Sequence, residues 1–370
     1  MKYLELDTPA LLIDQEIMLD NIKFMQAYAN KNKVNLRPHT KTHKIPELAL
    51  LQEKAGAKGI AVAKVGEAEV MAANGLRDIF IANEIVGDIK LQRIKKLMQQ
   101  GIKVSFGLDS IPQAEMIERN FADSPEKAQV LVEIEVGENR SGIIEEADFK
   151  DLLIYVKNNC PHIHFKGLFS HDGNSYNVSD LKACEENDLR AQRRTLRFAE
   201  LAAELGMKAE TVSIGSTPSL MHDFPILTGI TELRPGTYIL MDASQGHAYG
   251  NLKRCAATVL ATVMSRPTAE RIILDVGAKG ITMQSRTQGI CAIPGLGYIK
   301  QFPGTVIDEV FDEHAIIYSK DMHDHVKVGD KVEIIPVHIC PVMNLQEKAY
   351  LVSHGDVIKE MLVLCRGKLQ

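Results

Sequence analysis

The feature that most constrains this fold is an alternation, between about residues 34 and 240, of short β-branched runs with longer stretches of helical periodicity. Repeated βα units of this kind build parallel sheets covered by helices. The runs that read as strands are 34–38, 59–63, 78–82, 104–107, 130–136, 166–170, 211–215 and 231–234. The stretches 67–73 and 181–205 read as helices between them. Eight such units predict an α/β fold with a closed TIM-type (β/α)8 barrel.

The pattern changes after about residue 250, where β-rich runs are separated by turn signals. These runs are CAATVLATVMS, RIILDVG, AIIYS and KVEIIPVHIC. A length of 370 residues leaves room for a second domain beside a barrel of roughly 250 residues. We therefore expect a barrel over residues 14–245 and a mainly β domain over 246–370, which residues 1–13 join.

Charge and hydropathy narrow the class of protein. The net charge is −5, and no basic stripe with interleaved aromatic residues predicts nucleic-acid binding. No window approaches the ~20 apolar residues of a membrane span, and the opening MKYLELDTPALLID lacks the apolar core of a signal peptide. The six cysteines are scattered without a CxxC pair, which favours neither a disulfide framework nor a zinc ribbon. We expect a cytoplasmic protein that acts on a small molecule.

Several polar motifs directly follow predicted strands. RPHTKTHK with Lys41 follows the first strand, GENRSG with Arg140 the fifth, and HDGNSY with His171 and Tyr176 the sixth. GSTPS follows the seventh strand, and RPGTY covers the end of the eighth. The active site of a β/α barrel forms at the carboxyl ends of its strands. These motifs are therefore predicted to converge on one face.

The small residues of GSTPS and PGTY offer backbone N–H groups and hydroxyls that can surround an anion. Two such loops on adjacent strands indicate a phosphorylated ligand, and two routine tight turns are the alternative. A lysine beside these loops could form a Schiff base if cationic neighbours lower its pKa. Lys41 lies in sequence among Arg37, His39, His43 and Lys44, and a solvated basic turn is the alternative there.

The ordered series RPHTKTHK, AKVGEAE, VEIEVGENRSG, HDGNSY, SIGSTPS, RPGTY and HICPVMN resembles the fold-type III pyridoxal-phosphate (PLP) enzymes. Specifically, it resembles the D-serine dehydratase and D-threonine aldolase branch of the alanine-racemase-like fold, nearly end to end. The resemblance implies that Lys41 carries the cofactor and later transfers the proton. It places His171 near the pyridine ring and Arg140 near the ring hydroxyl. The phosphate cup that it implies consists of Ser216, Thr217, Gly236 and Thr237.

The residue before the PG turn faces the pyridine nitrogen in several members of this fold, and here it is Arg234. A guanidinium cannot give up its proton near neutral pH, so the pyridine nitrogen would stay unprotonated. The cofactor would then be a weaker electron sink, which favours prompt departure of a leaving group. Alternatively, Tyr176 makes this contact and Arg234 is a salt-bridged strand end.

A metal site is predicted at His338 and Cys340. They lie in KVEIIPVHIC, which reads as a strand, and residues i and i+2 of a strand share a face. A buried histidine beside a buried cysteine is the commoner situation, but HICPVMN resembles the family's metal-binding H-x-C or H-x-D motif. Nitrogen and sulfur donors predict Zn²⁺, with Mn²⁺ or Mg²⁺ as alternatives. Water and a substrate β-hydroxyl could fill the remaining positions, and Asn344 is a candidate partner of the ligands.

Two reactions of a β-hydroxy-D-amino acid fit this apparatus. In dehydration, Lys41 removes the Cα proton and hydroxide leaves Cβ, which yields a keto acid and ammonia. In retro-aldol cleavage, the Cα–Cβ bond breaks to give glycine and an aldehyde. HDGNSY, GSTPS and the cysteine of H-x-C resemble the D-serine dehydratase pattern more than the aldolases, where aspartate is usual at the second metal position.

We therefore expect a PLP- and zinc-dependent dehydratase, with the aldolase as the alternative and 3-hydroxyaspartate as a further candidate substrate. An amino-acid racemase and a non-catalytic PLP carrier are less favoured. The β-rich region and the metal pair argue against the carrier, which consists of the barrel alone. By analogy with the fold, we expect a homodimer.

Overall fold

The first part of the chain builds an eight-stranded sheet in the computed structural model, which describes residues 1–370. Its strands are β2 (Asn35–Leu36), β3 (Ile60–Val62), β4 (Asp78–Glu84), β5 (Lys103–Leu108), β6 (Ala128–Ile134), β7 (Ile163–Ser170), β8 (Thr211–Ile214) and β9 (Glu232–Leu233). Their order is β2-β9-β8-β7-β6-β5-β4-β3, and all neighbours are parallel. The N–H of Ala61 in β3 donates to the carbonyl of Pro38, just after β2, at 2.8 Å and links the two outer strands of this order. The predicted α/β barrel fold is confirmed.

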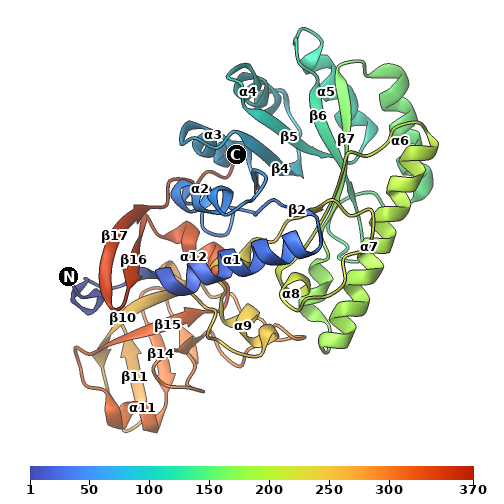
Figure 1. The fold of residues 1–370 in the computed structure, drawn as a ribbon. Coiled ribbons are helices and arrows are strands. Elements are labelled where there is room, and N and C mark those ends of the chain that lie inside the picture. The colour runs from blue at the N-terminus through green and yellow to red at the C-terminus, as the bar shows by residue number, and fades with distance from the viewer.

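Helices follow the strands and surround the sheet (Figure 1). They are α1 (Gln15–Lys31), which precedes β2, and α2 (Pro46–Lys54), α3 (Val65–Ala73), α4 (Asp88–Gln99), α5 (Ile111–Phe121), α6 (Glu146–Asn159), α7 (Leu181–Glu204), α8 (Thr217–Leu220) and α9 (Ala243–Tyr249). In α4, Leu91, Ile94, Leu97 and Met98 are all buried. Their helical spacing places one apolar stripe against the sheet. The helices predicted at 67–73 and 181–205 correspond to α3 and α7.

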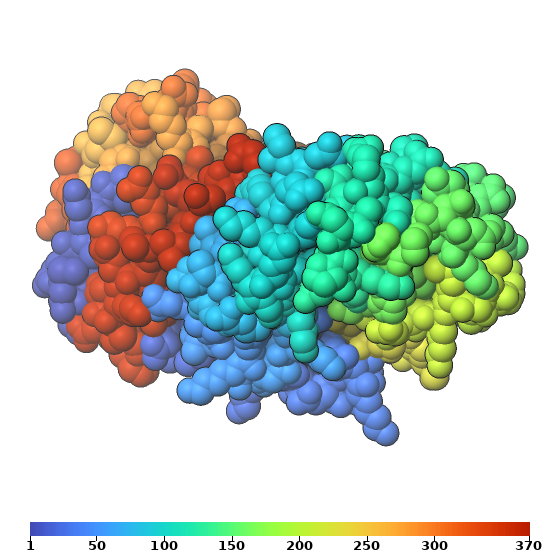
Figure 2. Space-filling model, turned by 90° about the horizontal axis from the view of Figure 1, so that it is seen from above, coloured from blue at the N-terminus to red at the C-terminus, as the bar shows by residue number.

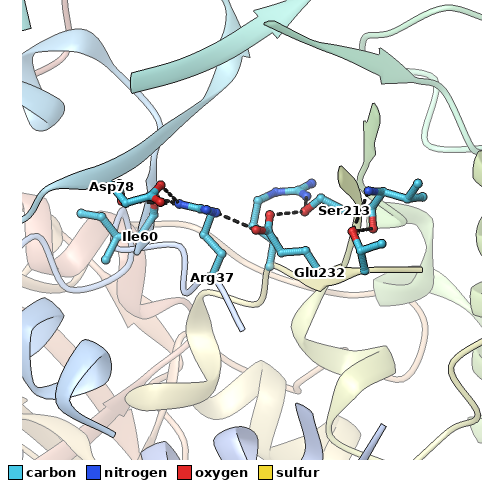
Figure 3. Close-up of polar contacts among 8 residues, drawn as sticks. Arg37, Ile60, Asp78, Ser213 and Glu232 are labelled. Atoms are coloured by element: carbon cyan, nitrogen blue, oxygen red, sulfur yellow. Dashed lines mark hydrogen bonds and ion pairs between the residues drawn. The ribbon is translucent and has the colours of Figure 1, made fainter. Parts of the chain in front are cut away.

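The interior of the barrel holds a buried polar network. Figure 3 shows Arg37 between two carboxylates, with its Nη1 atom 2.7 Å from Asp78 Oδ1 and its Nε atom 2.7 Å from Glu232 Oε2. The other oxygen of Glu232 accepts a hydrogen bond of 2.8 Å from Ser213 Oγ. Side chains two residues further along β4 and β9 point the same way and lie nearer the carboxyl ends of the strands. The network therefore lies beneath the face on which the polar motifs converge.

The second part of the chain is mainly β, as predicted. Its sheet consists of β1 (Ala10–Asp14), β10 (Ala257–Ser265), β11 (Arg271–Leu274), β12 (Gly297–Ile299), β13 (Glu309–Val310), β14 (Ala315–Tyr318), β15 (Lys331–Pro336), β16 (Lys348–Ser353) and β17 (Asp356–Leu362). The short helices α10 (Ala278–Ile281), α11 (Lys320–His325) and α12 (Ile339–Leu345) accompany it. β1 pairs with β10 and β16, so the start of the chain belongs to this sheet. The domain boundaries at 14–245 and 246–370 stay predictions.

The two parts lie side by side and share a core (Figure 2). One cluster of 49 buried residues includes Met18 of α1, Val259 of β10 and Ile334 of β15. The C-terminal segment returns to the barrel, where the N–H of Cys365 donates to the carbonyl of Lys44 at 3.1 Å (Figure 1). No helix has the length and apolar character that crossing a bilayer requires.

Candidate active site

A cavity of about 480 Å³ lies at the carboxyl ends of the barrel strands, where the second domain meets them. All the predicted site residues line it: Lys41, Arg140, His171, Tyr176, Ser216, Thr217, Arg234, Gly236, Thr237, His338 and Cys340. Their chain positions span some three hundred residues, so only the fold brings them together. The individual roles assigned to them stay predictions.

Lys41 stands in the turn after β2 and is half-buried. Burial lowers the pKa of its ammonium group, and the guanidinium groups of Arg140 and Arg234 lower it further. The Cys340 sulfur acts in the opposite direction without reversing the shift. A lowered pKa increases the fraction of neutral amine, which is the form that attacks a carbonyl or takes up a proton.

The predicted cause of this shift was partly wrong. Arg37 points into the barrel and forms a buried ion pair with Glu232, and Lys44 Nζ lies 2.9 Å from Glu67 Oε1. His39 does line the cavity, but burial holds its pKa well below its usual value, so it is uncharged near neutral pH. Residues adjacent in sequence thus face different partners, and the cations that act on Lys41 come from the segments that follow the distant strands β6 and β9.

The two small-residue loops leave hydrogen-bond donors free. Ser216 is the N-cap of α8 and Gly236 precedes the 3-10 helix η3 (Thr237–Ile239), and the backbone N–H of neither donates to a protein acceptor. The loops are tied together because the Thr237 N–H donates to Thr217 Oγ1 at 3.1 Å. These free N–H groups and the neighbouring hydroxyls suit a phosphate group, so the loops fit the phosphate end of PLP.

His171 has one ring nitrogen committed to the backbone. Its Nδ1 atom lies 2.9 Å from the carbonyl oxygen of Gly215, and burial holds the pKa of the imidazole well below its usual value. A neutral ring must therefore carry its proton on Nδ1, since a carbonyl can only accept. The Nε2 atom is left as an acceptor.

Arg140 is held by carboxylates that sequence reasoning missed. Its Nη2 atom lies 3.4 Å from Glu133 Oε1, and its Nη1 atom lies 3.4 Å from Glu138 Oε2. Glu133 also has a carboxyl neighbour, Glu84. Burial and Glu133 raise the pKa of Glu84 to about 9, so Glu84 is protonated at neutral pH. Glu133 was detectable in principle, because it follows Leu131 at a spacing of two on the same face of β6.

Arg234 is buried and fixed at both ends of its guanidinium group. Its Nη1 atom donates to Ser213 Oγ at 2.6 Å, and its Nη2 atom donates to the carbonyl of Ser170 at 2.6 Å. Burial lowers its pKa to about 10, so the group remains charged at neutral pH. Tyr176, the alternative contact to a pyridine nitrogen, stands on the 3-10 helix η2 (Gly173–Asn177).

His338 and Cys340 come together at the start of a helix and not on a strand as predicted. Strand β15 ends at Pro336, and His338 is the N-cap of α12, with Cys340 in its first turn. The prediction that both lie on one strand was wrong, because prolines at 336 and 341 interrupt a ladder and favour a helix start. Cys340 Sγ nevertheless reaches the barrel and lies 3.4 Å from Thr42 Oγ1, one residue from Lys41. Burial raises the pKa of this thiol, but the adjacent imidazolium of His338 outweighs that effect and brings it to about 7.

Asp242 supports His338 and was not recognised from sequence. It is completely buried, and its Oδ2 atom accepts from His338 Nδ1 at 3.0 Å and from the Ile339 N–H at 3.1 Å. Metal-binding histidines characteristically donate their second N–H to a carboxylate, which leaves the other nitrogen for the ion. The predicted partner Asn344 instead accepts from the Gly367 N–H at 3.0 Å.

His338 and Cys340 fit a metal site in which the protein supplies two ligands. No cluster of three or more His, Cys, Asp or Glu side chains that could hold an ion occurs in the structure. A carboxylate-oriented imidazole next to a thiol of lowered pKa suits a borderline-soft ion such as Zn²⁺. The remaining coordination positions would be open to water or substrate.

The barrel, the lysine after its first strand and the mainly β second domain define an alanine-racemase-type class of protein. The family model for the alanine racemase N-terminal domain matches residues 13–244, and the model for a putative serine dehydratase domain matches residues 256–352. D-threonine aldolase from Arthrobacter sp. is 32% identical over 98% of this chain and 93% of its own length. D-threo-3-hydroxyaspartate dehydratase from Delftia sp. is 30% identical over 96% of each chain. The chain belongs to this family of D-threonine aldolases and D-serine dehydratases, whose named members are lyases.

Solved structures agree with this assignment. D-threonine aldolase from Filomicrobium marinum superposes with a TM-score of 0.88 at 28% identity and covers 100% of this chain and 98% of its own. The D-threo-3-hydroxyaspartate dehydratase from Delftia sp. superposes with a TM-score of 0.90 at 28% identity over 98% of this chain and 99% of its own. A structure of a cysteine-to-alanine mutant of a D-threo-3-hydroxyaspartate dehydratase is described as the metal-free form, and it superposes with a TM-score of 0.90 at 28% identity over 98% of this chain and 99% of its own.

Proposed function

We propose that this protein is a PLP-dependent, metal-assisted lyase of β-hydroxy-D-amino acids and that it catalyses a dehydratase-type elimination. One observation carries the proposal. Lys41, the anion-binding loops and the pair His338 and Cys340 line the same cavity. A lysine, a phosphate site and a soft metal site within one small volume match a reaction that acts on Cα and on the β-hydroxyl of one substrate.

The cofactor would be held by groups that have no other partner. The free N–H groups of Ser216 and Gly236 would bind its phosphate, and PLP would supply the electron sink for charge that develops at Cα. Arg234 would face the pyridine nitrogen, because its guanidinium lines the cavity, is fixed by two hydrogen bonds and stays charged. It can donate a hydrogen bond to that nitrogen but no proton.

Proton transfer falls to Lys41. Its lowered pKa makes the neutral amine available to take the proton from Cα of the bound amino acid. His338 and Cys340 would hold a Zn²⁺ ion, which would polarise the β-hydroxyl and so assist its departure. Asp242 keeps the imidazole in the orientation that this requires.

The presence of Cys340 in the metal pair favours elimination over retro-aldol cleavage. A cysteine-to-alanine mutant described in a metal-free form belongs to a D-threo-3-hydroxyaspartate dehydratase, and the cysteine of H-x-C in this chain resembles the dehydratase pattern. Retro-aldol cleavage remains the second candidate, because a D-threonine aldolase is 32% identical to this chain over nearly its whole length. Amino-acid racemisation is less favoured, since a metal pair beside Lys41 has no function in it.

One assay separates these reactions. Purified protein with PLP and Zn²⁺ is given D-serine, D-threonine and D-threo-3-hydroxyaspartate in turn, and keto acid and glycine are measured separately. We expect keto acid and ammonia in equal amounts. Glycine without keto acid would exclude the dehydratase in favour of the aldolase, and neither product from any substrate would exclude the lyase. A homodimer and a cytoplasmic location stay predictions.

A further inference from the structure

Part of the wall of the cavity comes from a loop of the second domain, residues 282–293. This loop is docked on the barrel, because the N–H of Ile290 donates to the carbonyl of Val178 at 2.8 Å. Gly289 has a φ of +69°, and a Cβ there would lie 2.4 Å from the backbone of Asn177. Only glycine allows so close an approach in this conformation. The loop is therefore held against η2, at one side of the cavity.

Arg286 of this loop presents an uncommitted cation to the cavity. Its guanidinium carbon lies 4.7 Å from the ring centre of Tyr176, which itself lines the cavity. The Nε atom is buried and has no hydrogen-bond partner, and the side chain forms no ion pair. A buried donor without a partner lowers stability unless a ligand satisfies it.

The other cations that line the cavity already have partners or a task. Arg140 is shared between Glu133 and Glu138, and Arg234 is bonded to Ser213 and to the Ser170 carbonyl. Lys41 is the amine that the proposed reaction uses. Every amino-acid substrate brings a carboxylate into the cavity, and a carboxylate requires a cationic partner there.

We propose that Arg286 binds a carboxylate of the substrate and thereby selects amino acids over simple amines. This inference rests on the proposed function, because it assumes that an amino acid occupies the cavity. The planar fork of a guanidinium matches a carboxylate with two parallel hydrogen bonds, and stacking on Tyr176 restricts the orientation of that fork. The carboxylate is either the one on Cα or, in a substrate such as 3-hydroxyaspartate, the one on the side chain.

The test measures binding rather than turnover. Protein loaded with PLP is titrated with D-alanine, D-aspartate and isopropylamine, none of which has a β-hydroxyl to eliminate, and the change in cofactor absorbance yields each Kd. In Arg286→Gln we expect the Kd of D-aspartate, which carries both carboxylates, to rise about 10- to 100-fold, the range for a lost charge-assisted contact. The Kd of isopropylamine, which has no carboxylate, should not change.

The two carboxylates give different results. If Arg286 holds the Cα carboxylate, binding of both D-alanine and D-aspartate weakens; if it holds the side-chain carboxylate, only D-aspartate weakens. Arg286→Lys should lie between wild type and Arg286→Gln, because it keeps the charge and loses the fork. Arg271→Gln is the matched control, since Arg271 on β11 also has a buried Nε without a partner but does not line the cavity.

Equal Kd values in wild type and Arg286→Gln for all three ligands would overturn the inference. So would an equal loss for all three, which would mean that the arginine only maintains the loop. If the wild-type protein took up no PLP, the proposed function would fall and the role of Arg286 with it. Uptake of PLP without a carboxylate-selective loss would remove the role of Arg286 alone.

Discussion

Replacing Asp242 by alanine should weaken metal binding without removing either metal ligand. The carboxylate receives His338 Nδ1 at 3.0 Å, so the proton of a neutral imidazole is held on that nitrogen. Without the carboxylate, the proton can move to Nε2 and block the nitrogen that would bind the ion, and the ring is free to rotate. Both metal ligands are still present in this variant, but the His338 ring is no longer oriented.

The expected size follows from the contacts that disappear. Loss of a carboxylate partner of a metal-binding histidine typically costs ~10- to 100-fold in metal affinity, or about 1.4–2.7 kcal/mol. Asp242 also caps α9 through a hydrogen bond of 2.8 Å from the Gln245 N–H. Loss of an N-cap costs about 1 kcal/mol of folding stability, and the buried Ile339 N–H that loses its acceptor adds ~1–3 kcal/mol.

The assay titrates metal-stripped protein with Zn²⁺ in competition with a chromophoric chelator, and urea unfolding is measured on the same samples. Asp14→Ala is the matched control, because Asp14 caps α1 through the Ile17 N–H and lies outside the cavity. We expect Asp14→Ala to lose stability but to keep wild-type zinc affinity. Unchanged zinc affinity in folded Asp242→Ala would refute the argument that the carboxylate orients His338.

Four further outcomes are expected. Lys41→Ala should abolish the visible aldimine absorbance that PLP gives with the folded wild-type protein, and persistence of that band would overturn the cofactor assignment. Cys340→Ala should keep the PLP spectrum but lose metal-dependent turnover, whereas wild-type activity that survives chelation would exclude the metal role. Glu232→Gln should destabilise the barrel by roughly 3 kcal/mol in urea unfolding, because the buried Arg37 loses the charge of its buried partner and keeps only the partly exposed Asp78; a loss below about 1 kcal/mol would contradict this. Zn²⁺ binding should release about one proton at pH 8, where His338, with a pKa raised to about 10, is protonated and Cys340, with a pKa near 7, is mostly ionised. At pH 6 both groups are protonated, so about two protons should be released. Calorimetry in buffers of different ionisation enthalpy measures this release, and no release at pH 8 would contradict the prediction.

Much of the barrel could be predicted from the sequence alone. The strands and helices follow from apolar periodicity, which depends on neighbours a few residues apart and is therefore visible in a short window. The carboxyl ends of parallel strands meet at one edge, so Lys41, His171 and Thr217 were predicted to converge without knowledge of any distance. The structure places all three on one cavity.

Tertiary structure decided which groups act on one another. Arg37 and Lys44 were expected near Lys41, but their charges are taken up by Glu232 and Glu67, which lie on distant elements. Such pairing depends on the direction of each side chain after the sheet has closed, and local sequence does not contain that information.

The second domain shows the same division. The sequence indicated His338 and Cys340 through a motif, but only the structure showed that they begin a helix. It also showed that Asp242 supports His338 from behind and that Arg286 lines the cavity, although neither residue belongs to a recognisable pattern. Their positions depend on the packing of one domain against the other, because a contact between residues a hundred positions apart is a property of the assembled fold.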